Sequence, residues 1–111
     1  MAQAMLLNIV ATECKPDIEE KFNQWYNDVH IPLLLKYEGI KKVTRYKLQG
    51  ENPDQARYLA LYEFASPEAL AGMPGSDAFK AAMEEMQGSW PDGGFDIKWT
   101  AVYEPIKTWE R

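Results

Sequence analysis

The amino-acid sequence predicts an α+β fold in which helices cover one face of a four-stranded antiparallel sheet. Three observations support this prediction. Four separate segments have strand character, two longer regions have the helical spacing of apolar residues, and the segments follow the order βαββαβ. The chain has 111 residues, of which 46% are hydrophobic, so residues 1–111 are expected to form a single domain with one core.

The first strand and the first helix are predicted in the N-terminal third of the chain. Residues 5–12 form a nearly continuous apolar run, which is typical of a strand buried on both faces. A helix is expected to begin near Pro16, because proline fits the first helical position and acidic residues follow it. Pro32 cannot donate a backbone hydrogen bond, so we expect this helix to break or bend around residues 30–31. The apolar stripe of the helix consists of Ile18, Phe22, Trp25 or Tyr26, Val29 and Leu33.

Two strands are predicted in the middle of the chain. Residues 40–48 have the pattern of a half-exposed strand, and the glycine and proline cluster at residues 50–54 indicates a turn. Residues 57–65 form a stronger strand that is apolar on both faces, which implies cover on both sides. One face carries Tyr58, Ala60, Tyr62 and Phe64, and the other carries Leu59 and Leu61.

Helix-start signals and a last strand are predicted in the C-terminal half. Ser66, which precedes a proline, and Ser76 are both suited to cap the start of a helix, and the second of these helices is expected over residues 76–87. Residues 95–103 then alternate with the period of a strand. This alternation places Phe95, Ile97, Trp99, Ala101 and Tyr103 on one face.

The order βαββαβ is the ferredoxin-like arrangement, which leaves one face of the sheet without helices. The strands at residues 57–65 and 95–103 put large apolar side chains on that face too. Burying this face against a second copy, sheet against sheet, is the simplest solution. The sequence therefore predicts a homodimer.

Composition excludes several classes of partner. The net charge is −5 and no block of basic residues occurs, which argues against binding to nucleic acid or to an anionic membrane surface. No apolar run approaches the roughly 20 residues that span a bilayer. Residues 1–5 lack the basic region and the apolar run of a signal peptide, and Cys14 is a single cysteine, so we expect a cytoplasmic protein. The expected partner is a small apolar or aromatic ligand.

The segment from Trp25 to Pro32 contains the only histidine of the chain, His30. Imidazole titrates near pH 6.5, so His30 is a candidate acid or base. Tyr26 lies four residues earlier and shares a face with His30 on an unbroken helix, where its hydroxyl could orient the imidazole or polarise a carbonyl. In this interpretation Trp25 forms a wall of the site. The alternative is that His30 only satisfies backbone carbonyls that Pro32 leaves free.

Other candidate site residues lie on the strands and on the same helix. The amide of Asn8 sits in an apolar strand and needs a partner, either within the protein or on a ligand carbonyl. Phe22 continues the row of Tyr26 and His30, and Tyr62 and Trp99 could contact an aromatic substrate or fill a dimer core. The acidic pairs Glu19-Glu20 and Glu84-Glu85 are interpreted as solvated helix faces. The spacing of Cys14 and His30 matches no zinc site, so no metal is expected.

The pattern W-Y-x-x-x-H-x-P at residues 25–32, followed by Leu33, Leu34 and Gly39 and then two strands, resembles the EthD-like group of the dimeric α+β-barrel superfamily. The resemblance spans most of the chain and implies that two ferredoxin-like sheets pair into a dimeric α+β barrel. It further implies that His30 faces a cleft between the first helix and the sheet, with Trp25 and Tyr26 close by. Relatives include muconolactone isomerases, polyketide cyclases, dehydratases, monooxygenases and stress-responsive proteins.

Haem-degrading members of that superfamily have a trio of asparagine, tryptophan and histidine, in which the asparagine lies on the first strand and the histidine on the second helix. Asn8 fits the asparagine, but the predicted helix at residues 76–87 contains no histidine. This departure argues against haem ligation, and no cofactor is expected.

These observations lead to one functional hypothesis and two alternatives. The chain is expected to bind an aromatic or polyketide-like compound, with His30 as the acid or base of a cofactor-free dehydration, cyclisation or isomerisation. The corresponding enzyme classes are lyase, cyclase and isomerase. The first alternative is a non-catalytic binding or stress-related protein of the same fold. The second is a monooxygenase, either cofactor-free or haem-using.

Overall fold

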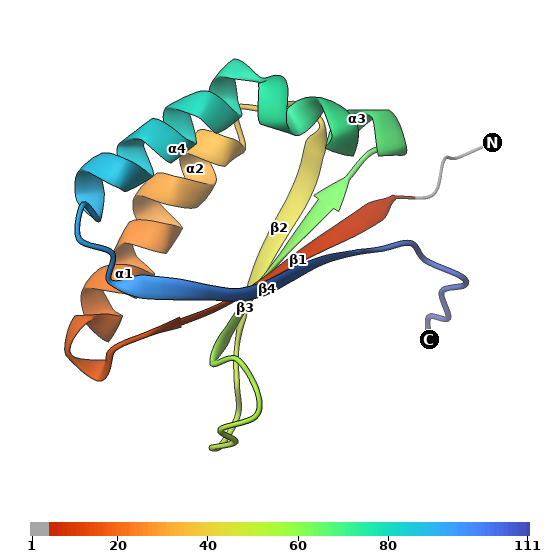
Figure 1. Cartoon of the computed structure of the whole chain (residues 1–111). Helices are drawn as coiled ribbons and strands as arrows, with labels where there is room; N and C mark the ends of the chain where they lie inside the picture. The colour runs from red at the N-terminus through yellow and green to blue at the C-terminus, as the bar shows by residue number, and fades with distance from the viewer. Residues whose placement is uncertain (1–4) are drawn as a thin grey trace.

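Four antiparallel strands form one sheet in the order β2-β3-β1-β4 in the computed structural model, which describes residues 5–111. The strands are β1 (Leu6–Cys14), β2 (Ile40–Lys47), β3 (Tyr58–Phe64) and β4 (Phe95–Tyr103). Figure 1 shows the helices gathered on one side of the sheet. The predicted ferredoxin-like α+β fold is therefore confirmed. The prediction that no signal peptide is present rests mainly on residues 1–4, which lie outside the described residues.

The first helical region runs from Pro16 to Leu34 without a break. It comprises η1 (Pro16–Ile18), α1 (Glu19–Trp25), the π-helical turn η2 (Tyr26–His30) and α2 (Ile31–Leu34). The chain does not leave the helix at residues 30–31, and the break or bend expected there takes the form of the π-helical turn. In this wide turn the amide of Ile31 donates to the carbonyl of Tyr26, and Pro32, which has no amide hydrogen, follows at the start of α2.

The second helical region consists of α3 (Pro67–Gly72), η3 (Met73–Gly75) and α4 (Asp77–Ser89). The predicted cap at Ser66 is confirmed, and Ser76, predicted to open the next helix, also caps it. The hydroxyl of Ser66 accepts a hydrogen bond of 3.1 Å from the amide of Ala69, and that of Ser76 accepts one of 3.1 Å from Phe79. No helix within residues 5–111 is long and apolar enough to cross a membrane.

A register shift in β4 changes which side chains face the helices. Ala11 of β1 pairs with Trp99, but the next residue, Thr12, pairs with Ile97, so Lys98 is an extra residue in the ladder. The strict alternation predicted for residues 95–103 is therefore wrong. Ile97 faces the helices, whereas Trp99 lies on the opposite face of the sheet.

The core lies between the helices and the sheet and is rich in aromatic rings. Phe22 is fully buried at its centre, with ring centroids 5.5 Å from Tyr26 and 5.0 Å from Phe95. On the other face of the sheet, Trp99 is 42% exposed and Tyr103 is 56% exposed. No helix covers this second face, yet β1 has no exposed residue, and Ala11, which pairs with Trp99, is fully buried.

Candidate functional site

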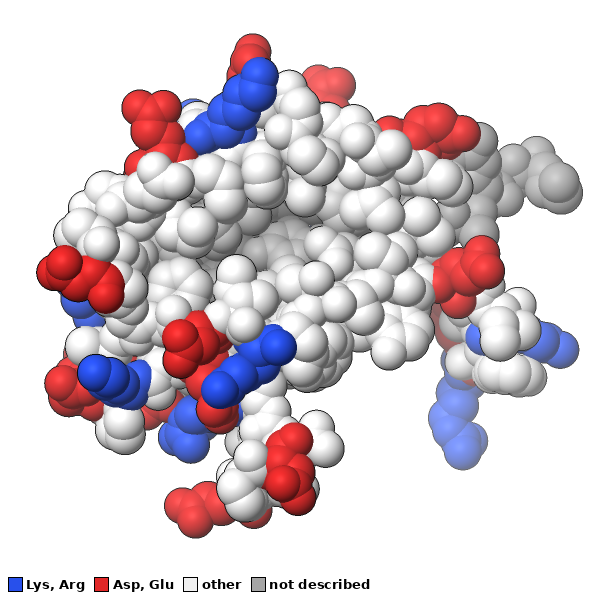
Figure 2. Space-filling model, viewed as in Figure 1, with Lys and Arg blue, Asp and Glu red and all other residues white. Residues whose placement is uncertain are grey.

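A cavity of about 260 Å³ lies between the helices and the sheet. Side chains from the first helical region, α4 and three strands form its walls, so no single segment of the chain builds the site. Figure 2 shows a hollow in the middle of the molecular face, with uncharged atoms around it and charged side chains at the margins. Six polar residues line the cavity: Asn8, Thr12, Tyr26, His30, Tyr62 and Thr100. The other lining residues are apolar, and three of them are methionines.

His30 is the one lining residue that titrates near neutral pH in its unperturbed form. Its side chain is only 6% exposed and stacks on Trp25, with ring centroids 4.7 Å apart. The ring makes no hydrogen bond to the backbone among residues 5–111, and its Nδ1 is buried without a partner. The alternative role as a backbone cap therefore has no contact to support it.

Burial lowers the pKa of His30 to about 4, and the carboxylate of Glu85 opposes this shift only partly. The imidazole is therefore neutral at pH 7 and has one nitrogen lone pair to offer. Such a ring accepts a proton or a hydrogen bond at its unprotonated nitrogen and donates a hydrogen bond through its single N–H, but it acts as a general acid only after it has taken up a proton.

Two tyrosine hydroxyls meet at the cavity wall. The Oη atoms of Tyr26 and Tyr62 lie 3.0 Å apart, and the two residues are 3% and 4% exposed. Burial raises the pKa of both phenols, so both hydroxyls keep their protons at neutral pH. Tyr26 also contacts His30, edge to face, at a centroid distance of 5.1 Å. The hydroxyl pair and the imidazole thus belong to one site.

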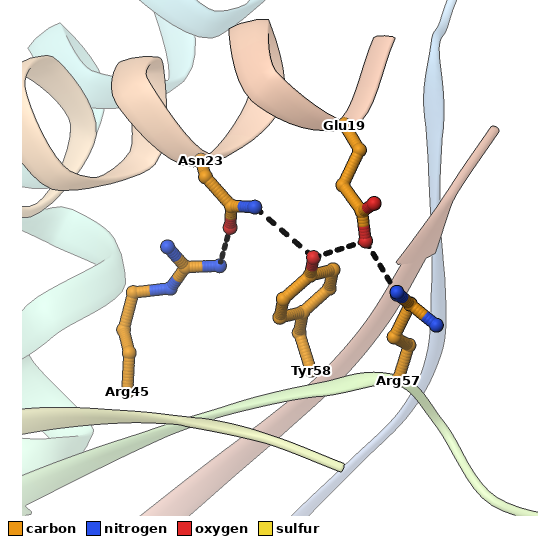
Figure 3. Close-up of polar contacts among 5 residues, drawn as sticks. All are labelled: Glu19, Asn23, Arg45, Arg57 and Tyr58. Carbon is orange, nitrogen blue, oxygen red and sulfur yellow. Dashed lines mark hydrogen bonds and ion pairs between the residues drawn. The ribbon is translucent and has the colours of Figure 1, made fainter. Parts of the chain in front are cut away.

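A polar network joins the first helical region to β2 and β3 and includes Arg45, Asn23, Tyr58 and Glu19 (Figure 3). The guanidinium of Arg45, from β2, lies 4.4 Å from the ring centroid of Tyr26. It donates hydrogen bonds to Oδ1 of Asn27 at 2.8 Å and to Oδ1 of Asn23 at 2.9 Å. Asn23 donates in turn to the hydroxyl of Tyr58 at 3.0 Å. Sequence reasoning missed Arg45, because its partners come from a helix far away in the chain.

Two of the acidic residues interpreted as solvated are engaged in contacts, so that interpretation is wrong for them. Glu85 accepts a hydrogen bond of 2.9 Å from Nε1 of Trp25 and a second one from Ser89. Glu19 accepts from Tyr58 and forms an ion pair with Arg57 (Figure 3). Glu85 thereby holds the indole on which His30 stacks.

The structure brings only part of the predicted site together. Tyr26, His30, Asn8 and Tyr62 line the cavity, and the amide of Asn8 has no hydrogen-bond partner within residues 5–111. Trp25 stacks on His30, but like Phe22 it belongs to the core and does not line the cavity. Trp99 lies on the opposite face and is removed from the set of candidate binding residues. Thr12 and Thr100 are lining residues that the sequence analysis did not select.

No cluster of three or more histidine, cysteine, aspartate or glutamate side chains suited to a metal occurs in the described part of the chain. The titratable groups that line the cavity are one histidine and two tyrosines. The site therefore offers proton transfer and hydrogen bonding from its own side chains.

Comparison with known proteins gives a family and a fold. Residues 5–93 match the model of a family described as Domain of unknown function (DUF4286). No curated protein matches the sequence.

Among solved structures, an ethyl tert-butyl ether D (EthD) family protein of Bacillus halodurans is 16% identical, with a TM-score of 0.66 over 94% of this chain and 100% of its own. A candidate antibiotic biosynthesis monooxygenase of Caulobacter crescentus is 20% identical, with a TM-score of 0.64 over 95% and 92%. A DABB family protein of Mesorhizobium loti with a ferredoxin-like fold is 15% identical, with a TM-score of 0.62 over 96% and 99%. These likenesses confirm the predicted resemblance to EthD-like proteins at the level of the fold.

Proposed function

The chain belongs to the DUF4286 family, a domain of unknown function, and we propose that it binds a small, mainly apolar molecule in the cavity beside His30. The cavity of about 260 Å³ carries this proposal. An apolar cavity of roughly 150 Å³ accommodates benzene, and drug-sized ligands occupy about 300 Å³ or more. The volume therefore suits a compound of one or two rings, and the uncharged rim in Figure 2 favours a neutral one.

We further propose that His30 moves a proton on this ligand. The neutral imidazole accepts a proton from a carbon or oxygen atom of the ligand, and the Tyr26–Tyr62 pair lies in the same cavity to stabilise charge that develops on a ligand oxygen. Return of the same proton to another ligand atom completes an isomerisation or cyclisation, and its delivery to a departing hydroxyl completes a dehydration. Each of these reactions balances without an external oxidant or reductant. The proposed substrate class is an aromatic or polyketide-like compound.

Ligand binding without turnover is the second candidate. One observation favours it: the pKa of His30 is about 4, which makes the imidazole a weak base in the empty cavity. In this case His30 serves as a hydrogen-bond acceptor that orients the ligand. The two candidates share the cavity and differ only in whether a proton leaves the ligand.

The two candidates can be separated with 1-indanone, a two-ring ketone with acidic protons next to its carbonyl. Binding is measured by quenching of tryptophan fluorescence, which Trp25, stacked on His30, should report. Exchange of those protons in D2O is followed by NMR. If His30 is a base, the wild-type protein accelerates exchange, and His30→Gln binds the ketone without accelerating it. Glu84→Gln, on the exposed side of α4, is the matched control and should behave as wild type.

The possible results separate the proposals. Acceleration that persists in His30→Gln contradicts the proposed base. Binding to the wild type without any exchange supports the binding-only function. If neither 1-indanone nor the related hydrocarbon indane binds, the proposed ligand site is wrong.

We propose that the open face of the sheet is covered by a second copy of the chain. Tyr46, Trp99 and Tyr103 are 52%, 42% and 56% exposed, and β3, which lies between their strands in the sheet, carries Leu59 and Leu61 on the same face. An apolar face of this kind is typical of a homodimer interface. Light scattering at micromolar concentration should give twice the chain mass, and Trp99→Glu should give monomers. A wild-type monomer would contradict the proposal.

A further inference from the structure

We propose that the ligand of this cavity carries a carbonyl or phenolic oxygen that accepts a hydrogen bond from Tyr62, and that Arg45 is a positioning residue that strengthens this bond through Tyr26. This inference rests on the proposed ligand-binding function and narrows its substrate class. It also gives Arg45, a cation that does not line the cavity, a role in ligand binding.

The first step concerns the hydroxyl pair. The two phenols together have two protons, and only one proton lies between oxygens that are 3.0 Å apart. No other hydrogen bond reaches either hydroxyl within residues 5–111, although both side chains are more than nine-tenths buried. One O–H is therefore left without an acceptor in a mainly apolar cavity, and a ligand oxygen is the group that satisfies it.

The second step identifies which hydroxyl is free. Arg45 lies over the ring of Tyr26 at 4.4 Å, and a cation at this position makes the Tyr26 hydroxyl the stronger donor of the two. Tyr26 therefore donates to Tyr62, and the remaining proton belongs to Tyr62. Donors in such a chain polarise one another, so the Tyr62 hydroxyl becomes a better donor to the ligand.

The third step concerns the charge of Arg45. In the described part of the chain the ion pair is between Glu19 and Arg57, whereas Arg45 is held by two amide oxygens, at 2.8 and 2.9 Å. Amide oxygens orient a guanidinium without cancelling its charge. Its field at the tyrosine pair therefore favours a ligand atom with partial negative charge, as a carbonyl or phenolic oxygen has.

The position of His30 completes the argument about ligand class. The ring of Tyr26 touches His30 at a centroid distance of 5.1 Å, while its hydroxyl touches Tyr62. A ligand with its oxygen at Tyr62 therefore holds the adjoining atoms in the part of the cavity that His30 lines. An enolisable ketone or a phenol matches this arrangement, because the acidic proton of such a compound lies close to the oxygen.

The test compares two probes of similar shape, 1-indanone and indane, which differ by the carbonyl group. In Tyr62→Phe, the dissociation constant of 1-indanone should rise about tenfold, as expected for one lost hydrogen bond, while that of indane should stay unchanged. The infrared C=O stretch of bound 1-indanone should also move to higher frequency in this variant. The proposal would be overturned if Tyr62→Phe changed the dissociation constants of 1-indanone and indane by the same factor and left the C=O stretch unchanged.

Arg45 is tested with two substitutions and the same readouts. Arg45→Met removes the cation, so the C=O stretch should move part of the way toward the Tyr62→Phe value and 1-indanone should bind about threefold more weakly. Arg45→Lys keeps a cation near Tyr26 and should restore the stretch. If Arg45 has a purely structural role, Arg45→Met should weaken the binding of 1-indanone and of indane equally and leave the C=O stretch unchanged. That result would overturn the assignment of Arg45.

The failure of this inference can be told apart from the failure of the proposed function. One outcome is that both probes bind the wild type while the substitutions at Tyr62 and Arg45 change the binding of 1-indanone no more than that of indane. In that case the cavity binds ligands and only the proposed hydrogen bond to a ligand oxygen is wrong. If neither probe binds the wild type, the ligand site and this inference are both wrong.

Discussion

Acidification from pH 7.5 to pH 5 should destabilise the protein through His30. The folded protein holds the pKa of this side chain near 4, whereas the value in the unfolded chain is 6.5. Between these two values the unfolded chain binds a proton that the folded protein does not. The free energy of unfolding therefore falls as the pH falls, and the contribution of His30 is fully present only above about pH 6.5.

The magnitude follows from the two pKa values. At pH 5 almost every unfolded chain carries the proton and few folded chains do, which costs the folded state about 2 kcal/mol. The whole loss is complete below about pH 4 and amounts to about 3 kcal/mol, as follows from the difference between the folded and unfolded pKa values of His30. Solvent screens this effect little, because His30 is only 6% exposed. For a domain with a total stability of about 5–15 kcal/mol this is a large effect.

Urea unfolding, followed by tryptophan fluorescence, should be measured at several pH values for the wild type and for His30→Gln. The carboxylates titrate in both proteins, so the difference between the two curves isolates the histidine. The wild type should lose about 2 kcal/mol more than His30→Gln between pH 7.5 and pH 5. Curves that stay parallel across this range would refute the argument.

An NMR titration gives an independent check of the same reasoning. Since the chain has one histidine, a single imidazole resonance reports His30 without assignment. Its midpoint should lie near pH 4. A midpoint near 6.5 would mean that burial does not exclude the proton, and the expected loss of stability would disappear with it.

Three further predictions concern the elements that hold the site. Tyr58→Phe removes the hydroxyl that forms hydrogen bonds with Asn23 and Glu19, so it should lower the free energy of unfolding by about 1–3 kcal/mol. The control Tyr46→Phe, on the exposed face, should change this free energy little. Equal effects of the two substitutions would show that the hydrogen bonds of Tyr58 do not stabilise the protein. Ser76→Ala removes the cap of α4 and should cost about 1 kcal/mol in urea unfolding, with an unchanged stability as the refuting result. Phe22→Ala should cost about 3–5 kcal/mol and lower the melting temperature, and a loss below 1 kcal/mol would place this ring outside the core.

Much of the fold could be predicted because its signals are local. A serine before a helix shows its cap in the sequence, and the alternation at residues 57–65 predicted the face of Tyr58 and Tyr62 that the helices bury. The spacing of Tyr26 and His30 likewise predicted that one helical face carries both, and the π-helical turn keeps them in contact. In each case the deciding interactions lie within a few residues of one another.

The wrong predictions concern interactions between distant residues. Pro32 was expected to break or bend the helix; the helix instead changes to a π-helical turn before Pro32 and continues as α2. Trp99 was placed with the binding residues, but its side of the sheet is set by the pairing of β4 with β1, where one extra residue turns it away from the cavity. A strand's own sequence does not show a shift that its partner strand imposes.

The sequence by itself determined the order of the elements, the caps of the helices and the presence of one histidine beside aromatic residues. The tertiary structure decided what that histidine can do. Stacking on Trp25 and burial keep its imidazole neutral, pairing of Tyr26 with Tyr62 leaves a hydroxyl at the cavity wall, and Arg45 reaches the same ring from β2. These contacts join segments that are far apart in the chain, and only the packing of the helices on the sheet brings them within reach.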